Sequence, residues 1–574
     1  MRVDRRSVIL GGASTALSAC MNQPGRAGKT QADMILHGGQ VLTVDEKFSK
    51  RTAVAVKDGK VIATGGAELL NNFDAPTKVD LAGRTLMPGF SDCHVHIYSL
   101  APRAIEPDKP KSIAELQDVL RAKAKELGKG EWITGYGWDE ALWTEKRNPT
   151  RADLDAAAPD NPVVLTRAGA HSAVANSRAF EAAKINKNTE DPQSGIIERG
   201  ADGEPSGIIR ERFDIVTRLV PPDTFETLRA SYINSLKALL PKGITSFHSA
   251  STGINDEPVE MGGSGRPSSD LTWRRMRGIY DQLGADLPRA TLYINFPGEE
   301  KLKAFGKKSG DGDDRVRLGG IGENLVDGGF TGPTAWLLAD YRGQPGFRGK
   351  GRYSDADLRA IVDACARTGW QTAFHAIGDA AIVQAVNAYA SALDKYPRQD
   401  HRWFLCHFTI MPPDETMEKM AKHSMMIAQQ PNFLYNLEGR YEQTLDDWRL
   451  EHNNPVVTPV KKHGIFMAFS SDNLPIDPRV ALYAATTRKG PSGRVHGAGE
   501  AISREEAIRF YTAHGPHLSW EEKTKGTLQA GKLADMVILK EDPLKVPDSG
   551  LLTLNVDATF VGGKLVHKRD GATV

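Results

Sequence analysis

Histidines and one aspartate close several short apolar segments of this chain, and side chains of these types can hold a metal ion. The first are His94 and His96, which stand two residues apart in the segment 91–96. On a β-strand, residues i and i+2 point to the same face, so both imidazoles can reach one ion. An isolated His-x-His pair is also compatible with ordinary core packing. The argument for a metal site therefore depends on the segments downstream.

The same arrangement recurs three times further along the chain. His375, His407 and Asp472 each follow directly on a short apolar run. If these runs are strands of one parallel barrel, their carboxyl ends meet at one mouth, where such barrels have their active sites. Repetition at four separate strand ends favours a shared site over a set of unrelated core histidines.

Four histidines and one carboxylate suit Zn²⁺ or a similar divalent ion, with no cysteine ligand required. Such an ion lowers the pKa of bound water toward 7 and makes hydroxide available at neutral pH. Asp472 can accept a proton from that water and pass it to the leaving group, acting as general base and then as general acid. The pattern therefore predicts metal-assisted hydrolysis with one or two divalent ions.

The pattern of apolar and polar residues along the chain predicts the elements that must position these residues. Between residues 88 and 520, helix-like stretches alternate with short buried-strand runs, as expected of βα repeats. Residues 354–368, for example, read as a helix and 371–374 as the strand that follows. The chain ends, 32–87 and 521–574, carry short apolar runs separated by Gly-rich turns, which indicates that they form one β-rich domain together.

Several segments, taken in order, resemble the amidohydrolase superfamily and within it the YtcJ-like branch, the amidohydrolase 3 family. The segments that carry the likeness are 88–96, 167–171, 243–246, 375–379, 406–407, 470–472 and 526–535. The resemblance extends over nearly the whole chain beyond residue 32. It implies an α/β fold, a distorted TIM (β/α)8 barrel with a β-sandwich built from both chain ends. It also implies an inserted segment at about 100–240 and hydrolysis of C–N bonds other than peptide bonds.

The resemblance also divides the metal ligands between two ions. It implies that His94, His96 and Asp472 bind the more buried ion and that His375 and His407 bind the second. The family usually places a carboxylated lysine between the ions, four residues before an Asp-Gly. Here Asp327 and Gly328 form that pair, and Glu323 stands in the lysine position. We predict that Glu323 bridges the ions; the alternative is a single-metal site with Glu323 as an accessory residue.

Further residues belong to the predicted pocket. His171 follows the strand-like run 163–166 and matches a branch-typical histidine, which implies that it holds a substrate carbonyl or carboxylate; packing is the alternative. Asp379 is predicted to orient a ligand imidazole. His248 ends another strand-like run and is a candidate for the same site. Four aromatic side chains are interpreted either as the lining of an apolar cavity or as ordinary core: Trp132, Tyr136, Trp138 and Trp143.

Composition excludes several classes of protein. The 574 residues include 73 Lys+Arg and 72 Asp+Glu, so a net charge of +1 gives no overall electrostatic reason to bind nucleic acid. Four cysteines in this length exclude a disulfide scaffold, and charges spread through the body exclude a polytopic membrane protein. The expected partner is a small-molecule substrate, and a homodimer is a prior expectation only.

The first twenty residues have a separate character. Arg5 and Arg6 precede an uncharged run at 8–19, and Cys20 follows it. The run is too short to span a bilayer but suits a signal peptide, and the paired arginines resemble a twin-arginine export signal. Residues 17–20 resemble a bacterial lipobox. We therefore predict a signal peptide at 1–19, a lipid on Cys20, a tether at 20–31 and a periplasmic or membrane-anchored protein.

Three functional hypotheses remain open at this stage. The first is hydrolysis of an amide, an N-substituted formamide or a cyclic amide. The second, within the enzymes, is a mononuclear deaminase-like or ester/lactone hydrolase, since the same nucleophile attacks each of these centres. The third is a non-catalytic binding lipoprotein on the same fold. Retention of Asp472 with all four histidines favours an enzyme.

Overall fold

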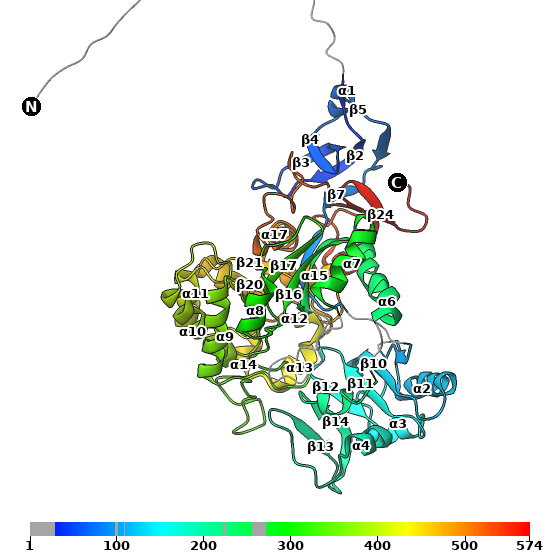
Figure 1. Ribbon diagram of the computed structural model, residues 1–574. Coiled ribbons are helices and arrows are strands. Elements are labelled where there is room, and N and C mark those ends of the chain that lie inside the picture. The colour runs from blue at the N-terminus through cyan, green and yellow to red at the C-terminus, as the bar shows by residue number, and fades with distance from the viewer. Residues whose placement is uncertain (1–28, 98–101, 108, 222–224, 255–270) are drawn as a thin grey trace, which may run out of the picture.

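The structure is a computed structural model that describes residues 29–97, 102–107, 109–221, 225–254 and 271–574. The predicted signal peptide, Cys20 and most of the tether lie outside these residues. No helix of the described part is both long and apolar enough to cross a membrane. In Figure 1 a β-sheet domain from both chain ends lies at the top, a βα barrel in the middle and an inserted αβ segment at the bottom.

Two parallel four-stranded sheets form the barrel. The first has the order β17-β16-β15-β8 and the second the order β18-β19-β20-β21. These strands are β8 (Phe90–Val95), β15 (Ile244–Thr252), β16 (Arg289–Ile294), β17 (Val316–Ile321), β18 (Ala373–Ala376), β19 (Phe404–His407), β20 (Met426–Gln429) and β21 (Met467–Phe469). Strands such as β8 and β16 are buried along their whole length, as expected of parallel strands covered on both faces.

Two seams join the halves. At one seam, Ile321 at the end of β17 forms an isolated parallel bridge with Thr372 before β18. At the other, the backbone N–H of Asp472 donates a hydrogen bond to the carbonyl oxygen of His94 over 2.8 Å. The predicted α/β, TIM-barrel-like fold is confirmed in this form, with two half-barrels that adjoin rather than one continuous ladder.

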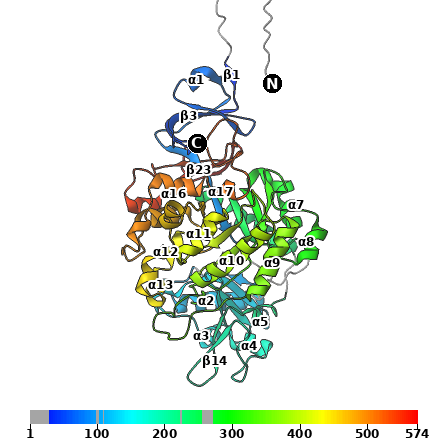
Figure 2. The same ribbon diagram turned by 90° about the vertical axis from the view of Figure 1, so that its left-hand side faces the viewer.

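Helices cover the outside of the barrel, as Figure 2 shows for α9, α10 and α11. The helix α9 (Asp355–Thr368) illustrates how the sequence sets their limits. Its N-cap is Ser354, whose side chain accepts from the N–H of Asp357, and Gly369 ends it in the left-handed conformation at φ 77°. Leu358, Val362 and Cys365 form its buried stripe.

The remaining helices have these bounds. Around the barrel lie α6 (Phe225–Lys237), α7 (Trp273–Leu283), α8 (Glu299–Phe305), α10 (Asp379–Lys395), α11 (Asp414–Lys422), α12 (Asn432–Asn436), α13 (Glu438–Thr444), α14 (Asp447–Glu451), α15 (Pro478–Thr487), α16 (Arg504–Tyr511) and α17 (Gly515–Leu518). The inserted segment contains α2 (Ile113–Leu127), α3 (Arg151–Asp155), α4 (Ser177–Ala183) and α5 (Asp214–Thr217), and α1 (Leu69–Asn72) lies near the N-terminal strands.

Strands from both chain ends share one eight-stranded sheet of order β24-β23-β22-β7-β2-β3-β4, with β6 beside β2. Its N-terminal strands are β2 (Met34–Leu42), β3 (Lys50–Lys57), β4 (Lys60–Gly65), β6 (Thr77–Asp80) and β7 (Thr85–Pro88), and its C-terminal strands are β22 (Met536–Leu539), β23 (Val556–Val561) and β24 (Lys564–Lys568). The join is the antiparallel pair β7–β22, in which Leu86 faces Ile538. Because β7 leads directly into β8, this sheet anchors the first metal-ligand strand.

The inserted segment contains a six-stranded sheet of order β13-β14-β12-β11-β10-β9. Its strands are β9 (Ala104–Ile105), β10 (Ile133–Trp138), β11 (Val163–Arg167), β12 (Ser172–Ala175), β13 (Ile196–Arg199) and β14 (Pro205–Arg210), and a two-stranded sheet elsewhere pairs β1 (Thr30–Gln31) with β5 (Phe73–Asp74). Trp138 and Trp143 are buried in the core of this segment. For these two residues the structure therefore favours core packing.

Candidate metal centre

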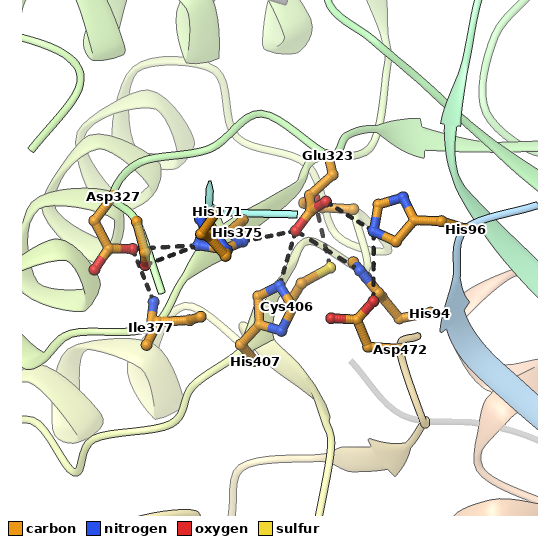
Figure 3. A network of polar contacts seen from close by, with 12 residues as sticks. His94, His96, His171, Glu323, Asp327, His375, Ile377, Cys406, His407 and Asp472 are labelled. Atoms are coloured by element: carbon orange, nitrogen blue, oxygen red, sulfur yellow. Dashed lines mark hydrogen bonds and ion pairs between the residues drawn. The ribbon is translucent and has the colours of Figure 1, made fainter. Parts of the chain in front are cut away.

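The predicted ligands converge on the carboxylate of Glu323, which follows β17 (Figure 3). Its Oε1 lies 2.7 Å from Nδ1 of His375 and 2.8 Å from Nε2 of His407. The Nε2 of His94 lies 3.7 Å from the same oxygen, and Nε2 of His96 lies 3.3 Å from Oε2. Strand ends separated by more than 300 residues of sequence therefore meet at one carboxylate.

Asp472 completes the cluster from the strand that closes the barrel. Its Oδ1 lies 3.5 Å from Nε2 of His96. The ligand atoms of His94, His96 and Asp472 lie within 4.8 Å of one another, and so do those of His94, Glu323 and His407. The two sets share His94, and each could hold a metal ion.

The fit of this site to a metal is seen in its buried, unsatisfied atoms. His94 is 0% exposed, and neither of its ring nitrogens has a hydrogen-bond partner among the described residues. Buried polar atoms without a partner are costly and rare in native structures. A divalent ion would satisfy the imidazole nitrogen, so the donor set fits the predicted cofactor.

The pKa shifts of the same residues favour metal binding. Burial lowers the pKa of His94 well below its ordinary value and that of His375 to about 3, so both rings are neutral, as metal ligands must be. Burial opposes the ionisation of Glu323, but the surrounding imidazoles outweigh it and hold its pKa well below the usual range. His94 and His375 are therefore neutral donors beside an ionised carboxylate, whereas burial of His407 is outweighed by its contact with Glu323, which raises the pKa of that ring.

Asp327 lies beside His375, whose Nε2 has the carbonyl oxygen of Gly328 as its hydrogen-bond partner over 3.3 Å. Its carboxylate is fully buried and accepts from the N–H groups of Ile377 (3.0 Å), Gly378 (2.8 Å) and Trp336 (2.8 Å). Oδ1 also lies 3.5 Å from Nε2 of His375, which leaves Nδ1 toward Glu323. Burial raises the pKa of Asp327 to about 7.

Asp379 does not have the role predicted for it. Its carboxylate accepts from the N–H of Leu338 over 2.8 Å and pairs with the guanidinium of Arg449, with Nε at 3.0 Å. The reason is that Asp379 is the first residue of α10, where its side chain meets the main chain of Leu338 and Arg449 of α14. Asp327 supplies the carboxylate beside His375 instead.

Comparison with known proteins identifies the family. The model of the Amidohydrolase family matches residues 77–567. The chain belongs to the amidohydrolase family. Similar proteins include the putative amidohydrolase YtcJ of Bacillus subtilis, 28% identical over 93% of this chain and 99% of the relative. The N-substituted formamide deformylase of Arthrobacter pascens is 26% identical over 94% of this chain and 99% of the relative.

The fold of this amidohydrolase is also found among solved structures. An uncharacterized metal-dependent hydrolase from Pyrococcus horikoshii superposes with a TM-score of 0.68 at 23% identity, over 90% of this chain and 99% of the other. Family membership places the chain among the hydrolases, and the groups of His and carboxylate donors are consistent with metal binding.

His171 lies at the metal pocket of this amidohydrolase. It lines the pocket together with His96, Glu323 and Asp472, and its ring centroid lies 5.7 Å from that of His375. The Nδ1 of His171 lies 3.1 Å from Oε1 of Glu211, a residue that the sequence analysis did not identify. Contact with the metal pocket favours the substrate-binding interpretation of His171 over simple packing.

Glu211 is in turn enclosed by polar partners. It accepts from the guanidinium of Arg352 and from the hydroxyl of Thr334. Burial of the carboxyl opposes its ionisation, but the charges of His171 and Arg352 outweigh that effect and lower its pKa to about 2. Glu211 is thus an ionised, buried carboxylate that fixes the Nδ1 side of His171.

Gly328 and Gly329 leave room for His171 and Glu211 beside the segment that follows Glu323. A Cβ built at Gly329 would lie 2.7 Å from Nε2 of His171, and one at Gly328 would lie 2.7 Å from Oε1 of Glu211. Real Cβ atoms do not approach this closely, so a larger residue at either position displaces the pair. The two glycines that follow Asp327 therefore leave the space that Glu211 and His171 occupy.

His248 does not reach the pocket. Its Nδ1 lies 2.7 Å from the hydroxyl of Tyr293, which donates to the carbonyl of Cys93 over 2.8 Å inside the barrel. Burial lowers the pKa of His248 to about 3. It is not among the residues that line the metal pocket.

Proposed function

We propose that this amidohydrolase cleaves C–N bonds outside peptides, in amides, N-substituted formamides or cyclic amides. The observation that carries the proposal is the convergence of four histidines on Glu323 in one buried pocket, with Asp472 beside His96. The full-length similarity to a relative named N-substituted formamide deformylase supports the choice of bond. Apolar side chains of the pocket, Phe330 and Phe433 among them, suit an apolar substituent on the substrate.

The donor set supports Zn²⁺ as the ion in the cell, since neutral imidazoles and carboxylates are its usual partners. In this proposal His94, His96 and Asp472 hold one ion, His375 and His407 hold the other, and Glu323 lies between them. When bound, the metal polarises the substrate carbonyl and lowers the pKa of water toward 7.

Asp472 is proposed to move the proton that the reaction needs. One of its oxygens, Oδ1, accepts from the N–H of Asn473 over 2.7 Å. Oδ2 has no hydrogen bond with any residue that the structure describes and can take the proton of the attacking water. Because an amine leaves poorly unless it is protonated, delivery of the same proton to the departing nitrogen completes the cycle.

His171 is proposed to bind the substrate carbonyl oxygen. It lines the pocket beside His375, and Glu211 fixes its Nδ1 side. A donor aimed at an oxygen that gains negative charge is worth about 3–4 kcal/mol in comparable sites. We expect His171→Ala to lower kcat more than it changes KM.

A substrate panel tests the proposal. The full chain, loaded with Zn²⁺ or Mn²⁺, is assayed on N-substituted formamides, N-acyl amines, cyclic amides, esters and lactones, with a chelator control. We expect amide-type turnover that Asp472→Asn abolishes and that Asp414→Asn, at a half-exposed position on α11, leaves unchanged. Turnover of esters or lactones alone would support the deaminase-like or ester/lactone hydrolase. If no substrate is turned over and Asp472→Asn changes no measured property, the result would support the non-catalytic binding lipoprotein.

Metal analysis tests the role of Glu323 separately. If Glu323 bridges, active protein contains two ions per chain, and Glu323→Ala loses at least one of them together with activity. One ion per chain in active protein, unchanged by Glu323→Ala, would contradict bridging and support the mononuclear alternative.

We also propose that the protein is exported and attached to a membrane surface through Cys20. The support is the order of Arg5, Arg6, the uncharged run at 8–19 and Cys20 in the sequence. Labelling with a radioactive fatty acid should mark the wild type and not Cys20→Ser. An unlabelled wild-type protein that remains in the cytoplasm would overturn this proposal.

A further inference from the structure

A second cavity borders Glu211. It has a volume of about 290 Å³, and it is lined by the loop before β13, the end of β14 and the segment 347–352. Because one water needs roughly 10–15 Å³ of such volume, this cavity has room for a small organic molecule. The metal pocket, measured in the same way, has about 20 Å³. Glu211 lines the second cavity and contacts His171 of the metal pocket, so it stands between the two.

The charges of this cavity are unbalanced. Its ionisable lining residues are Arg210, Lys350, Arg352 and a single acid, Glu211. Arg210 is paired with Glu198, which lies outside the lining, over 2.6 Å. Lys350 has no ion pair with any residue in the described part of the chain. After these pairings, one positive charge remains without a counterion.

The surroundings of the Arg352 side chain are a second, independent observation about this cavity. Its side chain is 4% exposed, its Nη2 binds Glu211, and its Nε donates to the carbonyl oxygen of Asp327 over 3.1 Å. Its Nη1 is buried and has no hydrogen-bond partner among the described residues. Because this nitrogen is closed off from the cavity, Arg352 contributes its positive charge to the site rather than a free donor.

Part of the lining is apolar. Pro192, Ile196 and Phe347 line the cavity together with the basic groups. Their presence disfavours inorganic anions, which would leave this surface without a partner. A ligand with one carboxylate and an apolar body satisfies both parts.

We propose that this cavity is a second ligand site, which binds a small organic carboxylate through Lys350, beside the positive charge of Arg352. The site is separate from the metal pocket and does not depend on the proposed reaction. It is connected to that pocket through three side chains in series, because Arg352 binds Glu211 and Glu211 binds His171. A carboxylate on Lys350 leaves the contact of Arg352 with Glu211 in place.

Calorimetric titration of the metal-loaded full chain tests the site, with phenylacetate as the probe and phenylacetamide as its neutral counterpart. We expect phenylacetate to bind and phenylacetamide to bind at least about 10-fold more weakly, because the neutral amide lacks the charge that the basic groups attract. Lys350→Glu should weaken phenylacetate binding by about 10-fold or more. The control Arg348→Glu, two residues away on the exposed side of the same segment and absent from the lining, should leave it unchanged.

A repeat with chelator-treated protein separates this site from the metal centre. Binding that survives chelation and is lost in Lys350→Glu supports the proposal. If binding disappears when the metal is removed and is unchanged in Lys350→Glu, the carboxylate binds at the metal and the proposal is overturned. Equal binding of phenylacetate and phenylacetamide, equal weakening by both substitutions, or no saturable binding up to the solubility limit also overturns it.

Discussion

Asn473 exchanges two hydrogen bonds with the main chain of His96. Its Oδ1 accepts from the N–H of His96 over 2.8 Å, and its Nδ2 donates to the carbonyl oxygen of His96 over 2.8 Å. The amide thereby continues the seam between β8 and β21 for one residue beyond the contact of Asp472 with His94. The first and last ligand strands are held in register by this side chain.

We predict that Asn473→Leu weakens metal binding by about 10- to 100-fold, the usual cost of losing a residue that orients a ligand. The leucine keeps the approximate volume but makes neither hydrogen bond, so His96 loses its fixed position. Competitive titration with a chromophoric chelator measures the affinity. Asn473→Asp, which can still accept from His96 but cannot donate to it, should give an intermediate value. Unchanged affinity in Asn473→Leu would contradict the positioning role.

The two aspartates near His375 should respond differently to substitution. Asp327→Asn weakens the contact with His375 and should lower metal affinity. Asp379→Ala breaks a buried ion pair with Arg449 and should lower the free energy of unfolding by about 3–5 kcal/mol, with metal affinity unchanged. Urea unfolding and metal titration of both variants provide the comparison. Loss of metal affinity in Asp379→Ala instead would restore the role predicted from the sequence.

The clustering of the four histidines and Asp472 could be predicted from the sequence because they stand at the ends of four strands. A strand-end position depends only on local pattern, and parallel strands bring such ends together. Glu211 could not be found in this way, since it lies 40 residues from its partner His171. Antiparallel pairing of Ser172 with Arg210 brings the next residues outward, His171 and Glu211, side by side. That register was not readable from the sequence.

Asp379 shows the opposite case, in which proximity along the chain misled the interpretation. It follows His375 by four residues, but a helix begins at Asp379 and directs its carboxylate away. The barrel was predictable from alternating helical and strand patterns, while its division into two half-sheets was not, because seam contacts such as Asp472 with His94 join distant strands.

Gly329→Ala should impair both activity and stability. Its new Cβ would lie 2.7 Å from Cδ2 and Nε2 of His171, so the ring must move. We expect a loss of about 1–3 kcal/mol in the free energy of unfolding and a lower kcat on any substrate found. Gly439→Ala in α13 is the control, because a Cβ there meets nothing within 4 Å. Equal kcat in wild type and Gly329→Ala would show that the position of His171 is unimportant.

The stability of the protein should depend on pH through Glu211. Its pKa in the folded chain is about 2, although burial alone would raise it, because the charges of His171 and Arg352 favour the ionised form. In the unfolded chain the value is about 4.3. A group whose pKa is lowered by folding contributes stability above the unfolded value and loses it as the pH falls toward the folded value. The contribution is about 3 kcal/mol near neutral pH and disappears between about pH 4.5 and 2.

Urea unfolding of wild type and Glu211→Gln across this pH range isolates that contribution, because all other titrating groups are common to both proteins. At neutral pH the variant should be less stable by about 3 kcal/mol, and the difference should shrink as the pH falls below about 4.5. Glu198→Gln removes a half-exposed partner of Arg210 and should cost about 1 kcal/mol or less. A difference between wild type and Glu211→Gln that stays constant down to the lowest pH would mean that the carboxylate is not held ionised by His171 and Arg352.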